Sequence, residues 1–214
     1  MQLKRIVMSF VGVIITAFSV GAFKFSAFGV DPFQSFMTGI DSLFPLSFGT
    51  LYVIVNALLL LFALIFDRHY IGIATMLNLF LLGYIVDFSQ SWLRALFPDP
   101  SILLRAVFFL IGFLFLCFGS ALYMTADLGV STYDAIALIV SKKWKLGHFR
   151  VVRMISDTAC ILIGAILLLA SGNDVSHLTA SIGIGTIITA LCMGPFVDWF
   201  HRKLSKRMGN ARFM

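Results

Sequence analysis

Residues 5–36 read RIVMSFVGVIITAFSVGAFKFSAFGVDPFQSF, and they align without a gap with residues 105–136, which read RAVFFLIGFLFLCFGSALYMTADLGVSTYDAI. Further on, IGIAT at 71–75 reappears as IGIGT at 182–186, and GYIVD at 83–87 reappears as GPFVD at 194–198. A duplicated apolar unit is typical of membrane transporters built from two structural repeats, which here are residues 1–100 and 101–214. The identical pairs in the first alignment include Arg5 and Arg105, Gly12 and Gly112, Phe18 and Phe118, Gly29 and Gly129, and Val30 and Val130.

The composition is that of a membrane protein. Of the 214 residues, 60% are hydrophobic and 12% are charged, and the mean hydropathy is +0.99, which lies outside the range of soluble domains. Six windows are long and apolar enough to cross a hydrocarbon core about 30 Å thick, and they lack the alternation of β-barrel strands. We therefore expect an all-α membrane protein that forms a single polytopic domain over residues 1–214. The windows are 6–26, 48–66, 71–91, 103–126, 151–170 and 181–200.

The net charge of +6 arises from cations that gather near the ends of the predicted spans. They form three groups: Lys4 and Arg5, the run from Lys142 to Arg153, and the tail from Arg202 to Arg207. Retention of positive charge on the cytoplasmic side explains this clustering. We expect contact with the lipid bilayer and no nucleic-acid partner.

Cysteine and histidine usage gives no sign of a cofactor. Cys117, Cys160 and Cys192 are single residues within apolar spans, and the four histidines lie far apart in the sequence. This spacing predicts neither a disulfide nor a metal site. The chain also lacks a P-loop and any recurring nucleophilic or acid–base set, which argues against use of ATP and against an enzyme.

Each repeat contains a short apolar segment after its first span, from Pro32 to Phe44 and from Thr132 to Ser141. A helix of this length covers about 20 Å, which is too short to cross the bilayer. We therefore predict one short re-entrant or interfacial helix in each repeat. Gly29 and Gly129 allow the chain to turn sharply before these helices.

Three crossings per repeat make the two repeats inverted relative to each other, with both termini in the cytoplasm. The loop after the second short segment holds five cations, whereas the equivalent loop at 41–47 holds none. Conversely, Asp67-Arg68-His69 corresponds to the cation-free loop Ser171-Gly172-Asn173-Asp174. Both differences fit the inverted arrangement, which leaves Lys24, Arg94 and Arg105 on the opposite side. In the alternative, the short segments also cross, and eight crossings form two parallel repeats.

Polar residues at membrane depth are the first candidates for a functional site, because each is costly there unless it is paired or faces a cavity. Gln34 and Asp134 occupy equivalent positions in the two short segments, beside Phe33 and Tyr133. Segments that enter from opposite faces would bring these groups to the middle of the membrane, whereas flat segments would leave them in water. Gln34, Tyr133 and Asp134 are therefore candidates for substrate binding.

Asn56, Arg153 and Asp157 complete the candidate set. Asn56 lies near the middle of the second span, where its amide needs a partner in another helix or in a substrate. Arg153 and Asp157 stand one helical turn apart, which permits an intramembrane ion pair. Alternatively, Arg153 reaches the interface and leaves Asp157 as a proton or cation site.

The third span of each repeat opens with Gly-x-x-Thr, as Gly72 and Thr75 and as Gly183 and Thr186. Small residues let helices approach closely, and a threonine hydroxyl can bond to backbone. We interpret these four residues, together with Gly29 and Gly129, as turn and packing residues.

Several strings resemble the YczE/YyaS/YitT family of bacterial multipass membrane proteins, and the resemblance covers nearly the whole chain. Thr132 stands where proline is common in that family. Because no soluble ligand-binding domain follows the last predicted span, the chain is similar to the short YczE branch. The resemblance implies the bacterial inner membrane as the location and says little about activity. The strings are Gly29-Val30-Asp31-Pro32-Phe33, Ser47-Phe48-Gly49-Thr50 with Asn56, IGIAT at 71–75, and ADLGVSTYDA at 126–135.

These features favour a small secondary transporter or a solute-binding membrane subunit for a small polar solute, with a coupling ion. The candidates combine amide, carboxylate, aromatic and guanidinium groups, and architecture alone does not fix function. The alternative is an accessory or regulatory membrane protein that acts through a homo-oligomer or a membrane partner. One cavity shared by Gln34, Asn56, Asp134 and Asp157 would favour the transporter.

Overall fold

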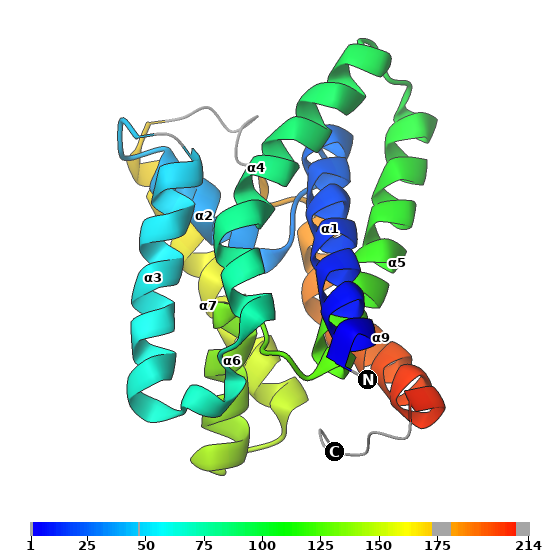
Figure 1. Ribbon diagram of the computed structural model, residues 1–214. Coiled ribbons are helices and arrows are strands. Elements are labelled where there is room, and N and C mark those ends of the chain that lie inside the picture. Colours follow the sequence, from blue (N-terminus) through cyan, green and yellow to red (C-terminus); the bar gives the residue numbers. More distant parts are fainter. Residues whose placement is uncertain (1, 47, 173–180, 209–214) are drawn as a thin grey trace.

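The computed structural model describes residues 2–46, 48–172 and 181–208, and those residues form only helices and their connections. Ser47 of the family-like string, and Asn173 and Asp174 of the predicted cation-free loop, lie outside the described residues. The elements are α1 (Gln2–Ser26), α2 (Pro32–Asp41), α3 (Phe48–Phe66), η1 (Arg68–Tyr70), α4 (Ile73–Leu96), α5 (Ile102–Ala126), α6 (Thr132–Leu138), η2 (Ile139–Lys143), α7 (Phe149–Ala170) and α9 (Ile184–Met208) (Figure 1).

Six of these helices are long and apolar enough to cross a membrane, and each overlies one predicted window. They are α1, α3, α4, α5, α7 and α9. The prediction of an all-α protein with six spans is therefore confirmed. α4 continues five residues beyond its window and ends at Leu96, because Pro98 disfavours a helical conformation at Phe97.

The surface of the bundle is apolar where no other helix covers it. Ile65 on α3, Leu110 on α5 and Ile166 on α7 expose more than half of their surface. Such a surface is stable against lipid tails and not in water. The chain is thus a multipass helical membrane protein in contact with the bilayer.

The spans of the two halves run in opposite senses (Figure 1). α1 and α4 run away from the end at which α1 begins, and α3 returns to it. α5 and α9 run toward that same end, and α7 runs away from it. α1 packs against α4 and α5, and α5 packs against α9.

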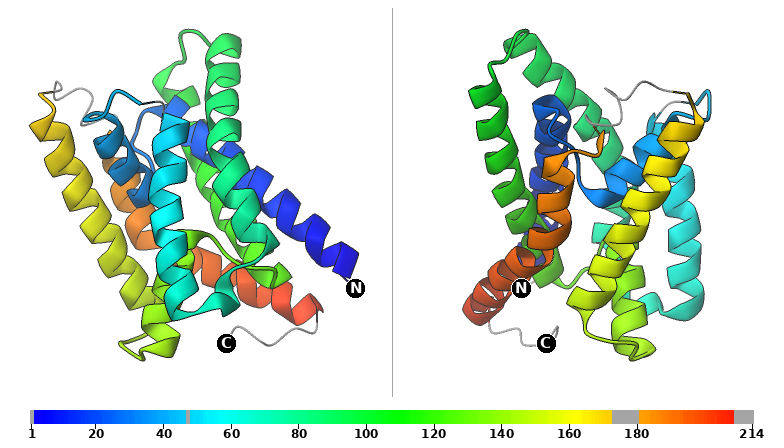
Figure 2. Two further views of the ribbon diagram at one scale, coloured as in Figure 1. Left: turned by 60° about the vertical axis from the view of Figure 1, so that its left-hand side comes forward. Right: turned by 180° about the vertical axis from the view of Figure 1, so that it is seen from behind.

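The short helices α2 and α6 do not cross the bundle. α2 begins inside the bundle and leads to the end at which α3 starts, as the two further views show (Figure 2). α6 continues into a π-helical turn, η2, and leads toward the opposite end, where α7 starts (Figure 1). Both helices begin with a side-chain cap, because Asp31 accepts a hydrogen bond from Gln34 N and Ser131 accepts one from Asp134 N.

The turn before each short helix packs on the third span of the other half. Gly29 and Gly129 adopt positive φ values of 110° and 100°, and a Cβ on either one would clash, with Gly183 and Thr186 or with Gly72 and Thr75 respectively. The backbone bonds are reciprocal: Gly185 N donates to Phe28 O and Ala74 N to Leu128 O, while Val30 N donates to Ser181 O and Val130 N to Tyr70 O. These contacts fix where α2 and α6 begin.

Candidate functional site

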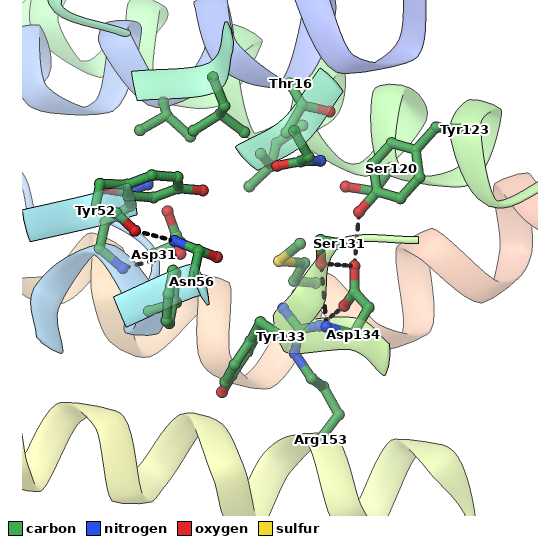
Figure 3. A pocket seen from close by; sticks show the side chains of 17 residues that line it. Thr16, Asp31, Tyr52, Asn56, Ser120, Tyr123, Ser131, Tyr133, Asp134 and Arg153 are labelled. Atoms are coloured by element: carbon green, nitrogen blue, oxygen red, sulfur yellow. Dashed lines mark hydrogen bonds and ion pairs between the residues drawn. The ribbon is translucent and has the colours of Figure 1, made fainter. Parts of the chain in front are cut away.

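A cavity of about 60 Å³ lies where α2 and α6 begin, and side chains from all six spans line it. One buried water needs roughly 10–15 Å³, so the cavity has room for several waters or one small solute. Figure 3 shows Tyr52, Asp31 and Asn56 on one side of it, and Tyr123, Ser131 and Asp134 on the other. Its polar lining residues are Thr16, Asp31, Gln34, Tyr52, Asn56, Asn78, Ser120, Tyr123, Ser131, Tyr133, Asp134 and Arg153.

Arg153 is held inside the bundle by two carboxylates. It forms an ion pair with Asp134, and its Nε lies 3.2 Å from Asp157 Oδ1. Only 11% of the Arg153 side chain is exposed, so the arginine does not reach the interface as one reading of the sequence allowed. Since α6 carries Asp134 and α7 carries Arg153 and Asp157, this cluster ties the second short helix to its neighbouring span.

Hydroxyl groups also donate hydrogen bonds to both carboxylates. Tyr123 and Ser131 each donate to Asp134 Oδ2 at 2.6 Å, and Tyr133 donates to Asp157 Oδ1 at 2.7 Å. Charge-assisted hydrogen bonds of this kind stabilise the ionised carboxylate. Asp134 and Asp157 therefore share Arg153 and are each bonded to at least one hydroxyl group.

Aromatic rings form one wall of the site. The Tyr133 ring stacks on Phe33 with centroids 4.9 Å apart, and the Arg153 guanidinium lies 4.4 Å from the centre of the Tyr133 ring. A cation over an aromatic face gains electrostatic attraction when water is absent. The equivalent positions 33 and 133 thus meet at the cavity.

Asn56 finds a partner in the other half of the chain. Thr132 Oγ1 donates to its Oδ1 at 2.5 Å, and Asn56 Nδ2 donates to Tyr52 O at 2.8 Å. The amide therefore joins α3 to the start of α6, and it also lines the cavity. The sequence left open whether Asn56 contacts another helix or faces a binding site. In the structure it does both.

Gln34 and Asp31 bring buried polar atoms to the cavity that lack, among the described residues, a hydrogen-bond partner and an ion-pair partner respectively. Gln34 is 3% exposed, and its Oε1 has no hydrogen-bond partner among the described residues. Asp31 is 9% exposed and accepts from Gln34 N at 3.3 Å, and no cation of the described chain lies within ion-pair distance of its carboxylate. Flat interfacial helices would not bury these groups.

The cavity adjoins a route toward the end of the bundle at which α1 begins. A pocket of about 10 Å³ shares Ser120, Asp134, Arg153 and Met193 with the cavity. This small pocket shares Met124, Phe149 and Val197 with a third pocket of about 120 Å³, which Lys142, Asp198 and His201 also line. The Arg153 cluster thus stands between the cavity and that outer pocket.

The site joins Gln34, Asn56, Tyr133, Asp134 and Arg153 in one cavity, and Asp157 contacts it through Arg153 and Tyr133. Gly29, Gly129, Gly72, Thr75, Gly183 and Thr186 lie instead at the turns described above. Sequence reasoning gave Asn78 of α4 only as a weaker candidate, and it missed Asp31, Tyr52, Thr16 of α1, and Ser120 and Tyr123 of α5. The available signal for Asp31 was its place beside Pro32, at the position equivalent to Ser131.

No group of three or more histidine, cysteine, aspartate or glutamate side chains in the described part of the chain is placed to hold a metal ion. The three cysteines are free thiols. The site presents carboxylate, amide, hydroxyl, guanidinium and aromatic groups to the cavity.

Comparison with known proteins places the chain among membrane proteins. Residues 3–202 match the family described as "Family of unknown function (DUF6198)". The chain is 28% identical over 194 residues to the uncharacterised membrane protein YczE of Bacillus subtilis (strain 168), with 86% of this chain and 80% of that protein covered. It is 23% identical over 184 residues to YyaS of the same organism, with 86% and 85% covered. An uncharacterised protein of Haemophilus influenzae is 27% identical over 130 residues, 61% of this chain and 53% of that protein. The resemblance to YczE and YyaS is thereby confirmed, and no solved structure matches the chain.

Proposed function

The chain belongs to DUF6198, a family of unknown function, and we propose from its central cavity that it is a small secondary transporter, or a solute-binding membrane subunit, for a small polar solute. One observation carries the proposal. A polar cavity with buried charges lies inside an apolar bundle, and every span contributes to its wall. Buried polar groups in a membrane are costly, and a site that binds a polar solute gives them a use.

We propose further that the halves are inverted repeats, with the cavity on their pseudo-twofold axis. Six pairs of equivalent positions line the cavity, and the turns make reciprocal bonds across the two halves. The opposite senses of the spans support the same arrangement. The pairs are Thr16 and Leu116, Val20 and Ser120, Asp31 and Ser131, Phe33 and Tyr133, Gln34 and Asp134, and Leu82 and Met193.

Both termini belong to the cytoplasmic side of a bacterial inner membrane in this proposal. The positive-inside rule supports it, because Lys142 and Lys143 of η2, Lys145 after it and Arg150 at the start of α7 gather at the end of the bundle where α1 begins. Two cations on the opposite side have local partners. Lys24 Nζ lies 3.9 Å from Asp87, and Arg105 Nε donates to Ser26 O at 2.6 Å.

The outer pocket supplies the route to the cytoplasm. It adjoins the cavity only through the residues around Arg153 in the described chain. If Arg153 separated from Asp134, the cavity and the outer pocket would join. If the ion pair formed again, the cavity would close. A secondary transporter needs a barrier of this kind beside a fixed site.

The proposal is tested by ligand-dependent stability of the purified protein. We would measure the unfolding temperature in detergent with a panel of small polar solutes, namely ammonium, methylammonium, guanidinium, urea, formate, acetate and glycine. A solute that binds the folded protein raises this temperature. We expect at least one to do so, and we expect Ser120→Leu, which fills the cavity, to abolish the shift.

Thr158→Leu is the matched control, because Thr158 is exposed on α7 and does not line the cavity. A shift that survives Ser120→Leu would place binding elsewhere. No shift with any solute, together with a normally folded Ser120→Leu protein, would favour the accessory protein that acts through a partner.

A further inference from the structure

The buried charges at the cavity do not balance. Three carboxyl groups, those of Asp31, Asp134 and Asp157, face one guanidinium, that of Arg153. An uncompensated charge inside the membrane is strongly unfavourable, so a buried carboxyl group without a partner takes up a cation or a proton. The contacts of the three carboxyl groups show which one lacks a cationic partner in the described chain.

Asp134 and Asp157 both have a cationic partner in Arg153. Asp134 has an ion pair with Arg153 and two hydroxyl donors, and Asp157 has the Arg153 Nε and the Tyr133 hydroxyl. Charge-assisted bonds of this kind stabilise a buried carboxylate. Neither group is therefore the carboxyl that is left without a partner.

Asp31 has no comparable partner. Its carboxylate caps α2 through backbone N–H groups and accepts no side-chain donor in the described chain. It lies in the connection between α1 and α2, outside the six spans, and burial raises the pKa of its carboxyl group. The equivalent cap in the other half is the neutral Ser131. Only one half of the site therefore carries an exchangeable charge.

The neighbours of Asp31 do not remove the imbalance. On the other elements around it, the titratable and charged groups are Lys24, Tyr52, Tyr123, Tyr133, Asp134, Arg153, Asp157 and Cys160. The two cations among them have closer partners, because Lys24 lies beside Asp87 and Phe48, and Arg153 lies between two carboxylates. From α4 and α9, the cavity receives Asn78, Leu82 and Met193, which do not titrate.

We propose that Asp31 is the proton-binding group of the cavity and that its proton is the coupling ion. In the empty cavity the carboxylate takes one proton from a hydronium ion and becomes a neutral carboxylic acid, and water is released. When the site opens to water of lower acidity, the acid returns the proton and becomes a carboxylate again. The coupling role rests on the proposed transport function, whereas proton binding at Asp31 does not.

Infrared spectroscopy of the protein in lipid vesicles tests the assignment without any solute. A protonated carboxyl group absorbs in the C=O stretching region apart from amides and carboxylates. We expect a carboxylic acid band that is lost as the pH rises, with a midpoint above the ordinary range of aspartate. The band should shift in D₂O, because the proton exchanges with water.

Variants locate the band. Asp31→Asn keeps a cap acceptor for α2, and Asp31→Ser copies the cap that Ser131 provides to α6, so both are expected to fold. Both should lack the band. Asp99→Asn, at an exposed position outside the cavity, and Asp134→Asn should retain it.

Two results would overturn the assignment: no titrating band in the unmodified protein, or a band that persists in Asp31→Asn. The outcome is separable from that of the solute panel. If the band depends on Asp31 but the protein binds no solute, the proposed transport function is contradicted and proton binding at Asp31 is supported. If the protein binds a solute but shows no band, solute binding in the cavity is supported and proton binding at Asp31 is contradicted.

Discussion

At the scale of residues, the site depends on Arg153. Its guanidinium meets carboxylates from two helices and lies over the Tyr133 ring, and the side chain is almost fully buried. Buried ion pairs add little net stability when complete, but removal of one member leaves an uncompensated charge. The consequence differs for each member, because Arg153 has two partners and each carboxylate has one cation.

We therefore predict that Arg153→Met is more destabilising than Asp157→Ala. The first change strands two buried carboxylates and should lower the free energy of unfolding by on the order of 3 kcal/mol or more. The second leaves Arg153 paired with Asp134 and should cost clearly less. Unfolding in a denaturing detergent, followed by far-UV circular dichroism, measures both. If both changes lowered the free energy of unfolding equally, the ion pair between Asp134 and Arg153 would not stabilise the protein.

The residue scale is also where sequence reasoning was least complete. Arg153 and Asp157 are one turn apart on one helix, so their proximity follows from helix geometry. Asp134 joins them only because α6 packs beside α7, a contact that no spacing in the sequence encodes. Asp31 resembles an ordinary helix cap before a proline, and its burial becomes visible only in the bundle.

At the scale of elements, the short helices define the site because each begins at the cavity. α2 and α6 bring positions 31, 33 and 34 and positions 131, 133 and 134 to it. The turns before them are fixed by the third span of the other half. Their existence and shortness follow from the sequence, since a segment of this length cannot cross the bilayer. The depth at which they begin was left open there, because re-entrant and flat helices have the same pattern.

Thr75 provides the test at this scale. Its hydroxyl is fully buried and donates to Val130 O at 2.7 Å, so it anchors the turn before α6. Thr75→Val keeps the shape and removes the donor, which leaves a buried carbonyl unsatisfied and should cost about 1–3 kcal/mol. Thr158→Val, which loses only a bond to its own helix on an exposed face, should cost little. Equal effects in thermal unfolding would show that the Thr75 bond does not hold the turn.

At the scale of the whole molecule, two halves of opposite sense surround one cavity that is polar and asymmetric. The first half supplies Asp31 and Gln34, and the second half supplies the charged cluster around Arg153. The sequence predicted the six spans from apolar length alone, and the duplication indicated the pairing of positions 33 and 133. It offered a central site as a hypothesis, but it did not predict which residues form the walls of the cavity, because these depend on side-chain packing across all six spans.

The inverted arrangement makes a prediction about sidedness. Ser42 follows α2 and Lys142 lies in η2, at equivalent positions of the two halves. In a background without Cys117, Cys160 and Cys192, single cysteines at these two positions should react with an impermeant maleimide from opposite sides of the membrane. Reaction from the same side would eliminate the inverted repeats.

Access of water to the cavity is the decisive measurement for a transport site. Ser120 lines the cavity and is 2% exposed, whereas Leu110 on the same helix is 59% exposed toward lipid. In the cysteine-free background, Ser120→Cys in proteoliposomes should react with the impermeant, cationic 2-(trimethylammonium)ethyl methanethiosulfonate added from either side, because a transporter opens its site to each side in turn. Leu110→Cys should stay unmodified. Protection of Ser120→Cys from both sides would show that the cavity is a packed core and would contradict a transport function.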